Sequence, residues 1–261
     1  LAYRVGEIYA DHVEDHDLAS DWFQRVLEVD PLNRDALERL ELLYRGAADY
    51  EAEGRILQRR IDASDTKQAS AAASRRLGDI RLEHLDDVAG AIEAYEDCAG
   101  IYLADVSFRN ALAKLYGAQS DFEALAELYR DVLVLEIPTE EKIDTLARQA
   151  QLHELQLEDL DTALEAAREI ILLDRKHLYG LRTVERIARQ REVWSELYEV
   201  LGLLAEVASD DLRQGRIYGE MAHIATVHLN EPVAGMAHLS AASTRDPEAL
   251  SGDDRLSTLR A

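Results

Sequence analysis

The sequence has a single cysteine, few basic residues and no long apolar run. Cys98 has no second cysteine to pair with, so an internal disulfide framework is excluded. No run of about 18 apolar residues occurs, which predicts that no segment spans a membrane. Lysine and arginine number 29 against 52 aspartate and glutamate residues, giving a net charge of −23. That charge opposes binding to nucleic acid or anionic lipid, because both require clustered cations.

The short motifs of catalysis and cofactor binding are also absent. The sequence contains no Gly-rich phosphate loop, GxSxG, HExxH or CxxC. His12 and His16 have a spacing that can place two imidazoles on one helix face. However, in the repeat described next, His16 corresponds to Val88, Leu160 and Pro232, none of which fits a metal-ligand position. We therefore predict no metal, no cofactor and no enzymatic activity.

What the sequence does contain is a repeat of 72 residues. Four sets of positions keep their chemical character at this spacing. They are the aromatic set Tyr50, Phe122, Trp194; the small set Gly6, Gly78, Ala150, Ala222; and the apolar sets Val26, Cys98, Ile170, Ala242 and Leu40, Leu112, Val184, Leu256. The repeat predicts units of about 1–66, 67–138, 139–210 and 211–261 in a single array, and we interpret the chain as part of a longer one.

Each unit holds four amphipathic helical segments, which make two hairpins of about 36 residues. Apolar residues recur at steps of three and four, and no two-residue alternation indicates a strand. The predicted helices cover 1–12, 18–29, 35–44, 50–63, 67–84, 88–102, 107–116, 121–135, 140–157, 160–173, 177–189, 193–208, 211–229, 233–244 and 247–261.

Two local patterns suggest how each first hairpin is built. A small residue on each helix, such as Gly78 and Ala91, lets the two backbones approach closely. An acidic pair such as Asp86-Asp87 precedes the second helix, where a carboxylate can accept from unpaired backbone N–H groups. Its recurrence at the hairpin turns favours capping over general acid–base catalysis.

The same register assigns other conspicuous residues to structure. Cys98 shares its position with apolar residues, which predicts a buried, inert thiol. The aromatic set is predicted to lie in the core. His12, His84 and His228 share one position with Gln156, which favours a structural role at helix ends over metal binding.

The chain resembles the tetratricopeptide repeat (TPR) family. Leu77-Gly78, Ala91 and Tyr95 match the family's Leu-Gly, Ala and Phe landmarks, and the segment from Val5 to Asp30 is the best single match. The chain departs from the family in a hairpin turn one residue longer than usual. It also departs in the second hairpins, where Glu41, Ala113 and Glu185 replace the Gly. The resemblance implies an all-α solenoid of antiparallel helical hairpins, wound as a right-handed superhelix, over essentially the whole chain.

The resemblance also implies a concave groove lined by the first helix of each hairpin, where a protein or peptide binds. The residues that it places there, besides Glu7, are Arg75, Asp79, Arg109, Lys114, Gln151, Arg182, Arg186, Arg189 and His223. The basic residues among them are conspicuous in so acidic a chain. An equally open interpretation is that they pair with neighbouring glutamates along solvated helices.

Three functions remain open at this point. The first is a non-catalytic scaffold that binds a protein or peptide partner in its groove. The second is a structural array that associates with copies of itself through the apolar faces of its end hairpins. The third is the regulatory arm of a larger enzyme or signalling protein.

Overall fold

The computed structural model describes residues 1–246, and these residues form helices joined by short turns, without a β-strand. The predicted helix 247–261, which contains Leu256 of one apolar set, lies outside the described residues. None of the described helices combines the length and the apolar character needed to cross a bilayer. By its contacts the chain divides into two compact units, Leu1–Asp121 and Phe122–Ala261, and each is described by itself. From here on, the first unit and the second unit mean these two parts and not the 72-residue repeats.

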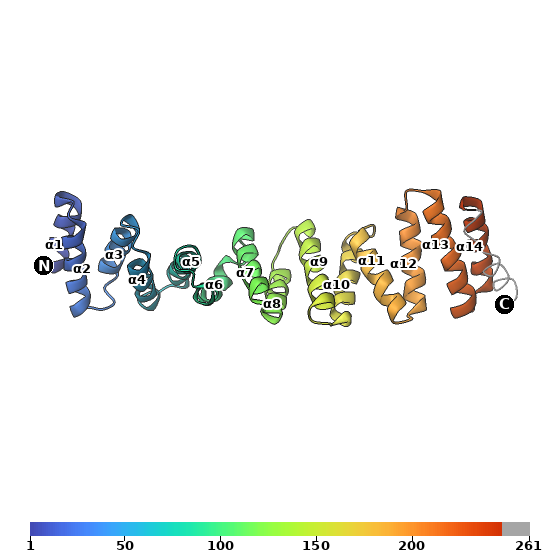
Figure 1. The fold of residues 1–261 in the computed structure, drawn as a ribbon, viewed down its shortest axis with the longest axis horizontal. Coiled ribbons are helices and arrows are strands. Elements are labelled where there is room, and N and C mark those ends of the chain that lie inside the picture. Colours follow the sequence, from blue (N-terminus) through green and yellow to red (C-terminus); the bar gives the residue numbers. More distant parts are fainter. Residues whose placement is uncertain (247–261) are drawn as a thin grey trace. The chain divides into compact units, whose positions relative to one another are not determined.

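The first unit contains seven α-helices and one π-helical turn, Tyr9–Val13, which continues α1 (Figure 1). The helices are α1 (Ala2–Ile8), α2 (His16–Val29), α3 (Arg34–Gly46), α4 (Tyr50–Asp62), α5 (Lys67–Glu83), α6 (Val88–Tyr102) and α7 (Val106–Gln119).

The described part of the second unit, residues 122–246, contains seven α-helices and a π-helical turn, Ile224–His228, after α13. The helices are α8 (Phe122–Val134), α9 (Thr139–Leu155), α10 (Leu160–Leu173), α11 (Leu178–Gln190), α12 (Trp194–Val207), α13 (Asp211–His223) and α14 (Pro232–Arg245).

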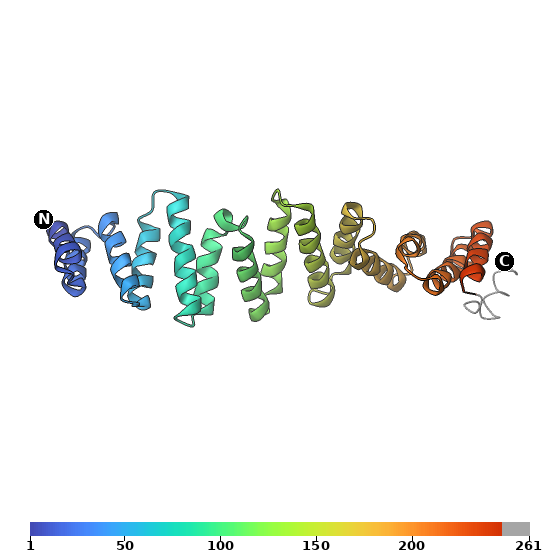
Figure 2. The same cartoon turned by 90° about the horizontal axis from the view of Figure 1, so that it is seen from above.

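Within each unit, the larger helix–helix contacts join helices that follow one another in the chain. The helices α5 and α6, for example, lie side by side in both views (Figures 1 and 2). The buried side chains form a series of separate clusters, one spanning α2 to α4 and the next spanning α4 to α6 in the first unit. The fold is therefore an α-solenoid of antiparallel hairpins, in which each hairpin is stabilised by its neighbours.

In each acidic pair, the first residue adopts the left-handed conformation and the second residue caps the following helix. Asp86 has a φ of 53°, the left-handed conformation that ends the first helix of the hairpin. The side chain of Asp87 then accepts a hydrogen bond of 2.9 Å from the N–H of Gly90 and caps α6. The same division holds for Glu14 with Asp15 and for Glu158 with Asp159.

These turn positions keep a constant spacing through the described residues. Left-handed residues end the first helices of the hairpins at Glu14, Asp86, Glu158 and Asn230 and at Ala48, Ser120 and Glu192. Within each of the two groups, consecutive members stand 72 residues apart. Residues 72 apart thus occupy corresponding places in every second hairpin.

The small residues lie where the two helices of a hairpin approach most closely. Gly78 is buried beneath the ring of Tyr95, and a Cβ on Gly78 would lie 2.4 Å from Tyr95 Cε1. In the first hairpin, Gly6 lies under the ring of Phe23 in the same way. The predicted close approach is confirmed, because Ala91 on the partner helix is also fully buried.

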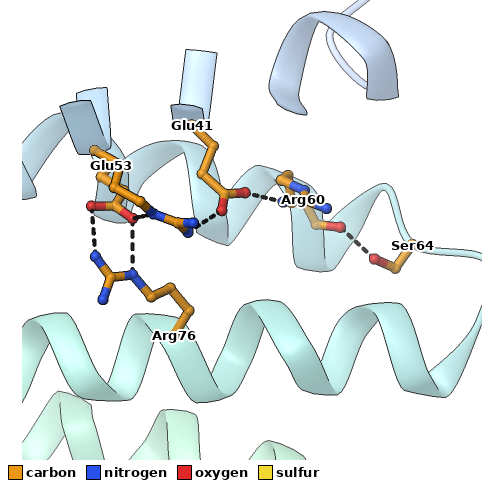
Figure 3. Close-up of polar contacts among 6 residues, drawn as sticks. Glu41, Glu53, Arg60, Ser64 and Arg76 are labelled. Atoms are coloured by element: carbon orange, nitrogen blue, oxygen red, sulfur yellow. Dashed lines mark hydrogen bonds and ion pairs between the residues drawn. The ribbon is translucent and has the colours of Figure 1, made fainter. Parts of the chain in front are cut away.

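A cluster of charges buried among α3, α4 and α5 joins one hairpin to the next (Figure 3). Glu53 on α4 is fully buried, and its carboxylate accepts hydrogen bonds of 2.9 Å from Arg45 Nε and from Arg76 Nε. Glu41 is nearly buried and pairs with Arg45 and Arg60. The cluster therefore contains two carboxylates and three guanidinium groups, so each buried carboxylate has cationic partners.

We predict that Gly78→Ala lowers the free energy of unfolding by about 1–3 kcal/mol, because the new methyl group overpacks against Tyr95. The control is Gly100→Ala on α6, where a Cβ meets no atom within 4 Å. That change should raise stability by up to about 1 kcal/mol through helix propensity. Urea unfolding followed by circular dichroism measures both, and equal effects of the same sign would contradict the prediction.

A second prediction concerns the charge cluster. Glu53→Gln should lower the free energy of unfolding by about 1–3 kcal/mol, because Arg45 and Arg76 lose a charged acceptor in a buried site. The control is Glu51→Gln, an exposed residue on the same helix. A double-mutant cycle with Arg76→Gln should give a coupling of about 0.5–3 kcal/mol. Coupling near zero would show that the pair contributes nothing to stability.

Candidate interaction surface

Among the described residues, no group of three or more His, Cys, Asp or Glu side chains is arranged to hold a metal ion. His12 and His16 are both exposed, and they lie on either side of the left-handed turn at Glu14. The two imidazoles therefore do not share one helix face.

Cys98 is fully buried, and its thiol donates to the carbonyl oxygen of Tyr95 at 3.3 Å. Burial raises the pKa of the Cys98 thiol to about 12, so the thiol stays protonated near neutral pH. A protonated, enclosed thiol is a poor nucleophile. The prediction that Cys98 is buried is confirmed.

Two histidines of the repeated histidine position stack on residues of the repeated aromatic position. The rings of Tyr50 and His84 stack with centroids 3.6 Å apart, and those of Trp194 and His228 stack at 3.7 Å. Each stack joins the start of the second helix of one hairpin to the end of the first helix of the next. For His84 and His228, the contact that the structure shows at the helix end is ring stacking between hairpins.

In the first unit, four of the five residues predicted for the groove are engaged within the protein. Glu7 forms an ion pair of 3.6 Å with Arg39. Arg75 donates to Asp105 at 2.9 Å, and this hydrogen bond lowers the pKa of the Asp105 carboxyl. Asp79 accepts from the hydroxyl of Tyr95 at 2.8 Å.

The other two predicted residues of this unit differ in exposure. Arg109 is only 7% exposed, and its guanidinium group donates to the carbonyl oxygen of Leu103 at 3.0 Å. Lys114 is exposed on α7. Lys114 is thus the groove candidate of the first unit that stands open to solvent, whereas Arg109 belongs to the packing of α7.

In the second unit, the predicted arginines lie on α11 and reach the helices on both sides. Arg186 pairs with Glu154 of α9, and Arg189 pairs with Glu220 of α13. Arg182 pairs with Glu185 on α11 itself, at 2.6 Å. These contacts are the ones expected if the arginines pair with neighbouring glutamates.

The ion pairs connect the first helices of three successive hairpins, α9, α11 and α13. Gln151 on α9 and His223 at the end of α13 are both exposed. The side chains of Arg186 and Arg189 remain about half exposed although each is paired. We call this set of Gln151, Arg182, Arg186, Arg189 and His223 the α11 face.

Comparison with known proteins finds no matching family model and no matching curated protein. Solved structures of low sequence identity do match. The C-terminal part of a TPR repeat-containing protein from Cytophaga hutchinsonii is 14% identical, with 99% of this chain and 100% of that chain covered and a TM-score of 0.41. A tetratricopeptide repeat protein from Parabacteroides merdae is 16% identical, with 81% and 79% covered and a TM-score of 0.37.

A third match is YrrB, described as a TPR protein with an unusual peptide-binding site. It is 14% identical, with 69% of this chain and 89% of that chain covered and a TM-score of 0.38. At these scores the evidence for the fold is the packing of successive hairpins described above. In that fold, and in the pattern around Gly78 and Tyr95, the chain resembles tetratricopeptide repeat proteins.

Proposed function

We propose that the chain is a non-catalytic scaffold that binds a protein or peptide partner on the first helices of its hairpins. The observation that carries this proposal is the α11 face. Arg186 and Arg189 on α11 pair with Glu154 on α9 and with Glu220 on α13, so ion pairs link the first helices of three successive hairpins. Stacked hairpins supply extended surfaces of this kind.

The α11 face retains hydrogen-bonding capacity although its charges are paired. Each guanidinium group has five N–H donors, and the pairs with glutamate use only some of them. The half-exposed heads of Arg186 and Arg189 can therefore donate to the backbone carbonyls or carboxylates of a partner without leaving Glu154 and Glu220. A peptide or a protein surface rich in carbonyl and carboxylate oxygens fits this chemistry.

In the first unit, the proposal rests on fewer residues. Among the groove candidates of this unit, Lys114 is the exposed cation, while Arg75 and Asp79 are half-buried and are bonded to Asp105 and Tyr95. Arg109 is left out of the proposed surface, because its guanidinium group lies inside the protein. The α11 face is therefore the better target for mutation.

We predict that the double variant Arg186→Gln, Arg189→Gln loses the partners that the unaltered chain captures from a cell lysate. Its melting temperature should change little, because half-exposed ion pairs contribute about 0–1 kcal/mol each. Affinity capture with mass spectrometry measures the first effect, and thermal unfolding by circular dichroism measures the second.

The matched control is Arg168→Gln. Arg168 on α10 makes the same kind of pair with Glu196 on α12, at 2.6 Å, but it joins second helices of successive hairpins. This variant should capture the same proteins as the unaltered chain. Unchanged capture by the double variant, or equal loss in the control, would contradict binding on the α11 face.

A further inference from the structure

The first unit contains a cleft between α2 and α4, the second helices of two successive hairpins. Its volume is about 350 Å³, which lies at the lower end of the range for clefts that hold small ligands. The aliphatic part of its lining consists of Leu27, Ala52 and Ile56, each no more than 6% exposed. The cleft therefore offers a small apolar floor between two described helices.

Two arginines of α4 line the same cleft. Arg55 is exposed, and among residues 1–246 it has no ion-pair or hydrogen-bond partner. Arg59, one helical turn later, donates to the carbonyl oxygen of Pro31 at 2.7 Å. This bond fixes the guanidinium group of Arg59 and leaves further N–H donors free.

The remaining polar residues of the lining leave these two cations as the donors for a ligand. Gln24 donates to the hydroxyl of Tyr44 at 2.6 Å, so these two side chains satisfy each other. Glu28 contributes one carboxylate. With two cations against that carboxylate, the cleft is locally basic in a chain of net charge −23.

The two arginines are not required by the repeat. Their counterparts are Glu127 and Asp131 in the next repeat and Glu199 and Leu203 in the one after it. Ile56, in contrast, has the apolar counterparts Leu128 and Val200. The apolar packing of this helix is thus kept along the chain, whereas the cations occur only at this cleft.

The chemistry of the lining selects one class of ligand. A guanidinium group binds a carboxylate through charge-assisted, often bidentate hydrogen bonds. An apolar body attached to that carboxylate would cover Leu27 and Ile56 and gain from their burial. Glu28 and the acidic chain around the cleft disfavour a doubly charged group such as a phosphate ester.

We propose that this cleft, which we call the α4 cleft, binds a small organic acid with one carboxylate and an apolar body. The carboxylate accepts hydrogen bonds from Arg55 and from the free donors of Arg59. A protein partner is a poorer occupant, because the core of a protein interface is a broader apolar patch than three aliphatic side chains provide. The α4 cleft shares no residue with the α11 face, so either proposal can fail without the other.

The test titrates octanoate into the isotope-labelled chain and follows the backbone amide and arginine Nε signals by heteronuclear NMR. We expect saturable shifts at Arg55, Ile56 and Arg59. Octanamide, which is uncharged, and butyrate, which has a shorter apolar body, should each bind about tenfold more weakly or worse. The two comparisons separate the contribution of the charge from that of the apolar body.

Variants of the two arginines test which groups hold the carboxylate. Arg55→Gln should weaken octanoate binding about tenfold, because a charged donor is lost. The double variant Arg55→Glu, Arg59→Asp introduces the residues that the next repeat carries at these positions, and it should abolish binding. The matched control is Arg130→Gln, which alters an exposed arginine of the second helix α8 outside the cleft and should leave binding unchanged.

Three results would overturn the proposal: no saturable shift with octanoate, equal affinity for octanoate and octanamide, or binding that Arg55→Gln does not weaken. An acetylated and amidated Phe-Glu peptide serves as the comparison for a carboxylate carried by a protein. Tighter binding of this peptide than of octanoate would also overturn it, because the side chain of a protein partner would then be the occupant.

Discussion

The structure depends on how closely the two helices pack against each other in the first hairpin of each 72-residue repeat. Gly78 lies directly under the ring of Tyr95, so the ring fills the space that a side chain on Gly78 would need. At the corresponding places in the next unit the chain has Ala150 and Ala167, both fully buried. A glycine facing a tyrosine ring, as in Gly78 and Tyr95, and two facing alanines, as in Ala150 and Ala167, both fill the space between closely packed helices. This spacing fixes which side chains of a hairpin remain available to its neighbours.

Contacts between hairpins vary more than contacts within them. Tyr50 and His84 join two hairpins by stacked rings, while Glu53 and Arg76 join the same two by a buried ion pair. At the counterparts of Glu53, the chain has Leu125 and Leu197, which are buried as well. A buried carboxylate needs cationic partners at defined places, whereas a leucine accepts many apolar neighbours. The charge cluster therefore makes α5 a more specific neighbour of α4 than apolar packing alone would.

Local and periodic features of the fold could be predicted from the sequence, because they depend on neighbouring residues. The caps at Asp15 and Asp87 and the buried thiol of Cys98 are examples. Features that depend on the packing of other helices could not be predicted from the sequence. The sequence places Glu53 and Arg109 in helices where charged residues are ordinarily solvated, and only the packing of adjacent helices buries them. For Glu53, the leucines at its counterparts were the available signal.

The pairing of the arginines on α11 bears on how such a surface recognises a partner. Arg182, Arg186 and Arg189 are matched by glutamates on α9, α11 and α13, so the face is close to neutral within a strongly acidic chain. Long-range electrostatic attraction, which raises association rates, needs an excess of one charge. A nearly neutral face offers little of it. Recognition there depends on short-range hydrogen bonds and shape, and the repeating spacing of the first helices sets both.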